Sequence, residues 1–233
     1  MSSVIGVDGC PVGWIAVIWN EAVTHRLCRT FAEVLALEAA IIAVDMPIGF
    51  PAREGRQAEK DVRKRLGARQ SSVFAVPTRA AVACAGYREA CTANLEASHP
   101  PKKISKQIFH LFPKMREIDA LMTPALQQRV HEVHPEFAFW AMNGGQPLAL
   151  PKKVKGTPSP PGLALRRSLL EQAGFPIDDL PEALYRRSDV GADDLLDACA
   201  CAWAARRIRD GEAIRFPAID QHDARGLRMA ISA

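Results

Sequence analysis

The chain has 233 residues, 48% of them hydrophobic and 24% charged, with a net charge of +4, which suits one large domain with a substantial core. No run of about 18 apolar residues occurs, and no basic segment followed by an apolar stretch opens the chain, so we expect neither a membrane helix nor a secretory signal. The six cysteines form no C-x-x-C pair, which favours the reducing cytoplasm.

Apolar runs and turn residues predict a β-hairpin at the start of the chain. Its strands are expected at residues 4–7 and 14–19, joined by the turn "DGCPVG", with a shorter strand at 23–29. A helix should follow, capped by Thr30 with Glu33 three residues later. A buried strand then precedes Asp45 in "AIIAVDMPIGFP".

Helical patterns dominate the remaining sequence. We expect helices over 56–67 and 78–94 and a helix interrupted near Pro113. The segment "RVHEVHPEFAFWAM" should open as a strand and continue as a helix. A loop over 147–162, an amphipathic helix closed by Gly174 and a long helix that ends at Gly211 should follow. This order predicts an α/β fold with a mixed sheet flanked by helices. We expect a single domain over 1–233 with a helical insertion around 53–125.

Aspartates stand where strands end and where the last long helix begins. Asp8 ends the first strand, Asp45 ends a later buried strand, and Asp194 and Asp197 lie in the first two turns of the helix. Carboxyl ends of neighbouring strands in an open α/β sheet meet at the ligand-binding edge. Converging carboxylates repel one another and require protons or cations. The pattern therefore predicts a cation site.

Each aspartate also has a structural interpretation. Asp8 could form the turn, Asp45 could cap the turn before Pro47, and Asp193 is explained by the helix dipole or as a cap. Asp194 and Asp197 lie about 60° apart on one helix face, where like charges cost stability unless a cation lies between them. The helix is apolar nearly all round after this turn, and its small residues would allow close approach to a sheet.

Two further residues could line the same site. Glu136 follows a β-like run and a proline that restricts the local backbone, and His134 precedes that proline. The spacing of the histidines fits no zinc site. We expect Glu136 to take part in catalysis and His134 to orient the substrate.

A basic segment follows the Asp45 strand. Seven of the seventeen residues in "REGRQAEKDVRKRLGAR" are Lys or Arg. We expect phosphate contacts from Arg56, Lys60, Arg63, Lys64, Arg65 and Arg69. The alternative is a solvated helix face. Lys152, Lys153 and Lys155 form a second basic group in a Pro/Gly-rich loop.

The combined motifs resemble a known family. The segments "GVDGCPVGW", "VDMPIGFP", "KDVRKRLGARQSSVF", "SKQIFHLFPKMREID", "EVHPEFAFWAMNGG" and "DDLLDACACAWAA" resemble the DUF429 family of predicted ribonuclease H-like nucleases. The D-x-x-D pair of Asp194 and Asp197 is similar to the arrangement in RuvC-type resolvases. The resemblance spans nearly the whole chain and implies a ribonuclease H-like fold.

The resemblance also implies a divalent-metal-dependent nuclease. A carboxylate set favours Mg²⁺ or Mn²⁺, and two such ions can activate water and stabilise the leaving oxygen of a phosphodiester. Asp8 would bridge both ions, Asp45 would bind one, and Asp194 and Asp197 would bind the other. Nucleic acid of unspecified type is the implied partner, and sparse aromatic residues favour recognition of its backbone or shape.

Two alternatives remain open at this stage. An actin-like or sugar-kinase ATPase shares the strand-end aspartate and the hairpin, but it normally needs two such domains and a Gly-rich second phosphate loop. A non-catalytic module is the other alternative, with structural acids and a basic face that docks nucleic acid or protein.

Overall fold

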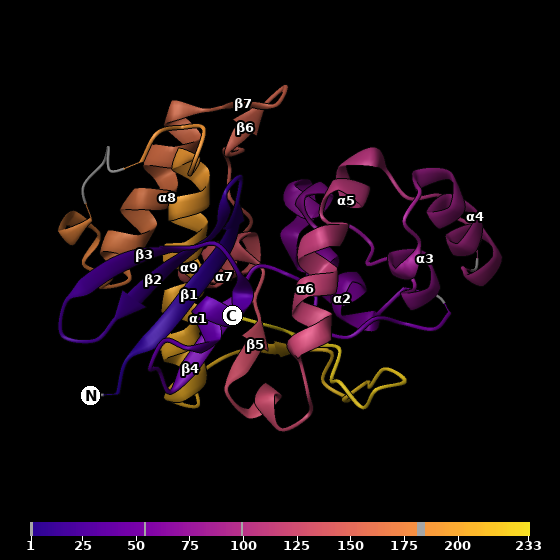
Figure 1. Cartoon of the computed structure of the whole chain (residues 1–233). Helices are drawn as coiled ribbons and strands as arrows, with labels where there is room; N and C mark the ends of the chain where they lie inside the picture. The colour runs from indigo at the N-terminus through magenta and orange to yellow at the C-terminus, as the bar shows by residue number, and fades with distance from the viewer. Residues whose placement is uncertain (1, 54, 99, 181–184) are drawn as a thin grey trace.

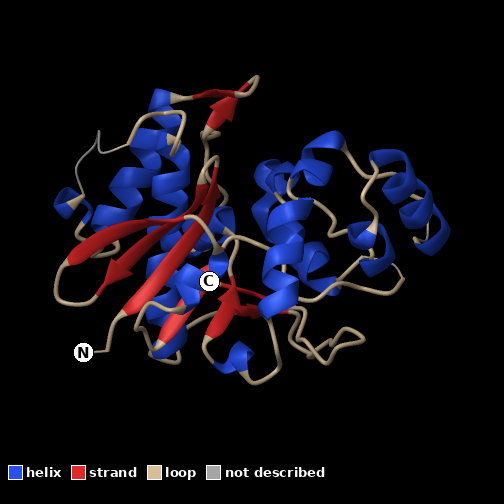
Figure 2. Cartoon of the chain, viewed as in Figure 1, coloured by secondary structure: helices blue, strands red, loops and turns tan. Residues whose placement is uncertain are grey.

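A five-stranded mixed sheet forms the centre of the protein, which is seen in a computed structural model that describes residues 2–53, 55–98, 100–180 and 185–233. The strands are β1 (Val4–Cys10), β2 (Gly13–Trp19), β3 (Val23–Cys28), β4 (Ile41–Val44) and β5 (Val130–Glu132). Their order is β3-β2-β1-β4-β5 (Figures 1 and 2). β1, β4 and β5 run parallel, while β2 is antiparallel to β1 and β3. The predicted α/β architecture with a mixed sheet is confirmed.

Helices cover both faces of this sheet. One face packs against α7 (Pro135–Met142), α8 (Pro160–Gln172) and α9 (Ala192–Arg209), and α9 crosses behind β1 and β4 (Figure 1). The short helix α1 (Phe31–Leu35) packs on the other face, and the Thr30 hydroxyl caps it through the Glu33 amide as predicted. Each face therefore has its own apolar core.

A second group of helices lies beside the sheet, between β4 and β5 in the sequence (Figure 1). It comprises α2 (Gln57–Leu66), α3 (Arg79–Ala83), α4 (Tyr87–Ala97), α5 (Lys106–His110) and α6 (Phe112–Leu121). The helix α6 ties the group to the sheet, because Glu117 accepts a hydrogen bond of 3.0 Å from the Trp14 indole. Lys114 also donates to the Gly13 carbonyl and lies over the Trp14 ring.

Short segments complete the fold. The hairpin of β6 (Lys153–Val154) and β7 (Thr157–Pro158) projects near α8, and β8 (Arg215–Phe216) pairs with β9 (Ile231–Ser232) (Figure 1). Ser232 bridges to Val133, directly after β5. In the described part of the chain, 3₁₀ segments lie at Gly67–Ser72, Leu126–Gln128 and Ile177–Asp179.

The helix α9 packs very closely on β1. A β-carbon added at Gly6 would lie 2.0 Å from the Ala202 nitrogen and 2.1 Å from the Ala198 oxygen. The absence of a side chain at Gly6 and the small side chains of the two alanines make this approach sterically possible. The expectation of close packing by this helix is confirmed, and residues 198–205 are all buried.

Most predicted elements are present, with local differences. The parallel pairing of β1 with β4 is confirmed, but β1 continues to Cys10, so Asp8 lies inside the strand. The helix expected over 78–94 is two helices, separated at residues 84–86. The expected loop over 147–162 contains the β6–β7 hairpin and the start of α8. None of the described helices has the length and apolar content that a membrane crossing requires.

Candidate metal centre

The pleat of two parallel strands directs Asp8 and Asp45 to the same side of the sheet. Side chains alternate along a strand, so Asp8 shares the α9-facing side of β1 with Val4 and Gly6. Asp45 directly follows β4 and continues the side to which Ala43 belongs. The Asp45 amide donates to the Val7 carbonyl at 2.9 Å, which holds Asp45 beside the part of β1 that carries Asp8.

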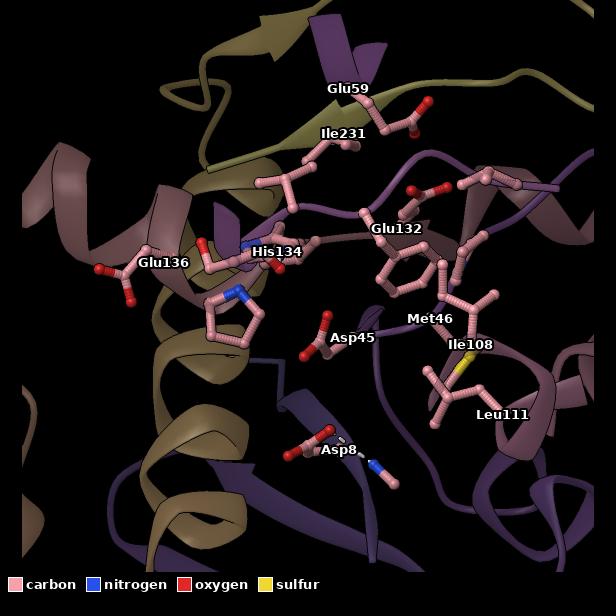
Figure 3. A pocket seen from close by; sticks show the side chains of 18 of the residues that line it. Asp8, Asp45, Met46, Glu59, Ile108, Leu111, Glu132, His134, Glu136 and Ile231 are labelled. Atoms are coloured by element: carbon pink, nitrogen blue, oxygen red, sulfur yellow. Dashed lines mark hydrogen bonds between the residues drawn. The ribbon is translucent and has the colours of Figure 1, made fainter. Parts of the chain in front are cut away.

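The third carboxylate comes from the helix that covers this side. Asp197 lies in the second turn of α9, where the close packing at Gly6 holds the helix against β1. One carboxylate oxygen from each of Asp8, Asp45 and Asp197 lies within 4.8 Å of the others, a spacing that could hold a metal ion. Figure 3 shows Asp8 and Asp45 facing the same space.

Burial and mutual repulsion make these carboxylates hard to ionise. Burial raises the pKa of Asp8 well above its usual value, and the negative charges of Asp45 and Asp197 raise it further. Burial also raises the pKa of Asp45 to about 6 and raises that of Asp197, although the Lys152 ammonium opposes the latter shift. Proximity to a cation would favour the charged forms of all three groups.

Lys152 supplies a positive charge at the cluster. Its ammonium contacts the Asp197 carboxylate and lies 3.8 Å from the Asp193 carboxylate. Desolvation opposes its charge, but the attraction of Asp197 and Asp8 prevails and raises the pKa of Lys152. From its sequence, Lys152 was predicted only to belong to a basic loop, and its place at the carboxylates was missed.

The other two aspartates of α9 lie outside the cluster, and Asp194 caps the helix. The Asp194 carboxylate turns back and accepts a 2.8 Å hydrogen bond from the Gly191 amide at the helix start. Burial raises its pKa, and this hydrogen bond opposes the shift. Asp193, for which the helix dipole or a capping role was expected, lies in the first turn but does not cap the helix; it is buried and pairs with the Lys153 ammonium at 2.6 Å. The structure therefore clusters Asp197, and not Asp194, with Asp8 and Asp45.

His134 and Glu136 line the pocket beside the carboxylates, but neither belongs to the cluster itself. His134 follows β5, and its positive form would favour ionisation of nearby Asp45. Its Nε2 lies 3.2 Å from the Ser72 carbonyl, and its buried Nδ1 has no hydrogen-bond partner among the described residues. Glu136 lines the same pocket but points away from Asp8 and Asp45 (Figure 3) and pairs with buried Arg166 at 2.6 Å.

The prediction that Arg56 contacts phosphate is wrong. Arg56 is 1% exposed, and its guanidinium binds the carboxylates of Glu59 and Glu132. One of its nitrogens also donates to the carbonyls of Ile48 and Gly49, at 3.0 and 3.2 Å. With every guanidinium nitrogen engaged, Arg56 joins the loop after β4 to β5 and α2. Burial raises the pKa of Glu132 to about 7, although Arg56 opposes the shift.

The rest of the predicted basic segment lies on or just after α2. Lys60, Lys64 and Arg65 are exposed, whereas Arg63 and Arg69 are half-buried. Arg65 stacks over the Phe216 ring, 4.0 Å from its centre. None of these five residues lines the pocket at the carboxylates. Their contact with phosphate stays a prediction.

A pocket of about 490 Å³ opens beside the carboxylate cluster. Its polar side carries Asp8, Asp45, Lys152 and Lys153. Its apolar side includes Ile108 and Leu111 of the helical group (Figure 3). A pocket of this volume accepts a small ligand or one segment of a larger one. The arrangement places an apolar wall opposite a charged one.

The fold and the site define an α/β protein with a buried carboxylate cluster at the carboxyl ends of its parallel strands. A family model described as "Protein of unknown function (DUF429)" matches residues 6–222, so the chain belongs to the DUF429 family. This confirms the family resemblance. Searches of curated proteins and of solved structures gave no match.

Proposed function

We propose that the protein is a divalent-metal-dependent nuclease that hydrolyses phosphodiester bonds of nucleic acid. The observation that carries this proposal is the approach of the Asp8, Asp45 and Asp197 carboxylates to within 4.8 Å of one another. Three elements far apart in the sequence supply them. Such convergence of like charges is costly unless cations or protons offset it.

We infer a ribonuclease H-like topology for the sheet. In support, an antiparallel hairpin precedes two strands parallel to β1, and a C-terminal helix covers the sheet and brings an aspartate to the strand ends. The family resemblance implies the same arrangement. The proposal depends on the site for its chemistry, because fold alone does not determine activity.

The donor set fits a hard divalent ion. Asp8, Asp45 and Asp197 offer oxygen ligands, which Mg²⁺ and Mn²⁺ prefer. When bound, one or two such ions supply the positive charge that activates water and stabilises the leaving oxygen. His134 and Asp45 line the same pocket, where His134 could orient a phosphate or a water (Figure 3).

The pocket suits a nucleotide-containing substrate. Lys152 and Lys153 can neutralise a phosphate, while Ile108 and Leu111 offer an apolar surface to a sugar or base. Exposed Lys60, Lys64 and Arg65 lie outside the pocket and could bind the nucleic acid backbone farther along.

The contact between Lys152 and Asp197 specifically favours a second candidate function. A lysine that permanently neutralises the carboxylates would make them a structural cluster, and the protein would then be a non-catalytic module that binds nucleic acid or protein. In that case, divalent ions would have no effect on binding or stability.

A nuclease screen with matched variants tests the proposal. Single-stranded and duplex DNA, RNA, hybrids and junctions are incubated with wild type, Asp8→Asn and Asp178→Asn, in Mg²⁺, Mn²⁺ or chelator. The Asp178 side chain is 86% exposed, pairs with Arg167 and does not line the pocket at the carboxylates, so it serves as the control. We expect metal-dependent cleavage by wild type and Asp178→Asn, and none by Asp8→Asn. Equal cleavage by all three proteins, or none by any, contradicts the proposal.

A further inference from the structure

We propose that Lys152 is an exchangeable internal cation, which occupies the carboxylate cluster in the metal-free protein and gives way to a divalent ion. This inference rests on the proposed metal site and adds a regulatory element to it. The protein would hold its own competitor for the metal at the base of the β6–β7 hairpin, in a chain segment separate from the three carboxylates.

The charge balance at the cluster makes exchange favourable. The Lys152 ammonium contacts the Asp197 carboxylate. One carboxylate oxygen from each of Asp8, Asp45 and Asp197 lies within 4.8 Å of the others. A single positive charge cannot neutralise all three carboxylates when they are ionised, and ammonium offers no vacant coordination positions. A divalent ion brings twice the charge and can accept oxygen ligands from all three groups.

The main chain around Lys152 is firmly anchored. The Ser159 amide donates to the Lys152 carbonyl at 2.8 Å, and Arg166 donates to the Leu150 carbonyl at 3.1 Å. The Pro151 carbonyl lies against Gly162, where an added β-carbon would come within 1.9 Å of its oxygen. The ammonium is thus positioned at the cluster by a fixed backbone.

The same anchor explains the buried position of Glu136. Glu136 pairs with Arg166, and the Arg166 guanidinium in turn contacts the carbonyls of Leu150 and Gly162. Glu136 therefore acts as a positioning residue for the segment that carries Lys152. Its predicted place in the site is indirect.

The Lys152 side chain can leave without movement of this backbone. It is 32% exposed, and its four-carbon stem rotates freely compared with an Arg fork. Lys153 and Lys155 provide internal comparisons on the same hairpin. Lys153 pairs with Asp193 outside the cluster, and exposed Lys155 lies in the turn between β6 and β7.

Mn²⁺ titration by calorimetry tests the exchange, with wild type, Lys152→Met and Lys155→Met. Removal of the competing charge should tighten Mn²⁺ binding by about tenfold in Lys152→Met, equal to about 1.4 kcal/mol. Lys155→Met should bind Mn²⁺ with the affinity of wild type. Lys152→Arg should also bind Mn²⁺ no more tightly than wild type, because it keeps the competing charge. The same Kd in wild type and Lys152→Met, or no binding by either, overturns the inference.

Amine labelling provides a second readout that needs no variant. Wild-type protein is treated with an acetylating reagent with and without Mn²⁺, and each lysine is followed by peptide mass spectrometry. Mn²⁺ should raise the labelling rate of Lys152 several-fold and leave that of Lys155 unchanged. An unchanged Lys152 rate while Mn²⁺ binds means that the ammonium does not leave, which overturns the inference.

These results separate the inference from the proposed function. Tighter Mn²⁺ binding by Lys152→Met, with no cleavage of any nucleic acid by wild type, supports the exchange and contradicts the nuclease. Equal Mn²⁺ affinities with metal-dependent cleavage intact contradict the exchange alone.

Discussion

Gly6 of β1 and Ala202 of α9 are in backbone-to-backbone contact, because a β-carbon at position 6 would lie 2.0 Å from the Ala202 nitrogen. This contact sets the distance between the sheet and the helix. Asp8 lies two residues beyond Gly6 on the same side of β1, and Asp197 lies just over one turn before Ala202. The spacing of the two carboxylates therefore depends on a glycine that carries no charge.

Substitution Gly6→Ala should destabilise the protein and loosen the metal centre. The added methyl group meets main-chain atoms that cannot rotate away, so we expect a loss of at least about 1–3 kcal/mol in the free energy of unfolding, measured in urea. The rise in melting temperature caused by Mn²⁺ should also shrink.

Gly55→Ala is the matched control, since nothing lies within 4 Å of a β-carbon there and its φ is not positive. Its effect should stay within about 0.5 kcal/mol. A Gly6→Ala protein as stable as Gly55→Ala would show that α9 can shift without cost.

The raised pKa of Asp45 predicts a pH-dependent stability. The folded protein holds this proton up to a pKa of about 6, against an ordinary value of 3.8. Since the folded state binds the proton more tightly, the free energy of unfolding should fall as pH rises from 4 through 6. Asp45→Asn removes this contribution, so its stability relative to wild type should grow across that range, by at most about 3 kcal/mol.

Chemical unfolding of both metal-free proteins from pH 4 to 8 measures this difference. Saturating Mn²⁺ should remove the wild-type loss at high pH, because the ion favours the ionised carboxylates. A stability difference between the two proteins that does not vary with pH would contradict the raised pKa.

Asp194 and Asp197 should differ in their effect on metal binding. The Asp194 carboxylate accepts the Gly191 hydrogen bond, and an asparagine oxygen can do the same. Asp194→Asn should therefore keep most of the Mn²⁺-induced rise in melting temperature, whereas Asp197→Asn should lose it. Equal losses in differential scanning calorimetry would restore Asp194 as a metal ligand.

Arg56 should matter for stability, in contrast to its basic neighbours. Arg56→Met leaves Glu59 and Glu132 buried without their partner, at a cost of about 3–5 kcal/mol in the free energy of unfolding. Exposed Lys60→Met, on the same helix, should change stability by no more than about 0.5 kcal/mol.

Exposed Lys60 should instead matter for nucleic acid binding. If Lys60 contacts phosphate, Lys60→Met should reduce the slope of log affinity against log salt by about one. An unchanged slope in fluorescence anisotropy titrations would make α2 a solvated helix face.

The positions of Asp8 and Asp45 were predictable because strand periodicity and the carboxyl-end rule are local properties. An apolar strand followed by an aspartate indicates both the element and the edge of the sheet. The apolar α9 pattern similarly predicted burial, and its small residues predicted close packing. Asp197 was therefore expected at the cluster before its side chain was placed.

The contacts of Arg56 and Lys152 could not be read from the sequence. Arg56 lies in a run of charges that looks solvated, and its burial depends on Glu132, supplied by a strand 76 residues later. Lys152 belongs to a loop without periodicity, and its position depends on Gly162 and Arg166 of α8. The two-residue strands β8 and β9 are too short to give a pattern.

The roles of Asp193 and Asp194 were also undetermined by helix geometry. Either residue suits the first turn of a helix, and the dipole stabilises both. The choice depends on the Lys153 ammonium, which pairs with Asp193 and leaves Asp194 to bind Gly191. A tertiary contact thus selects the local cap.

The separation of the carboxylates along the chain has a consequence for folding. Asp8 and Asp45 can come together once the early strands β1 and β4 pair, but Asp197 arrives with α9, which is synthesised long after both strands. Like-charge repulsion at the centre is therefore complete only at the final docking step. A divalent ion that recognises the assembled centre would act late in folding, and its binding would report that β1 and β4 have met α9.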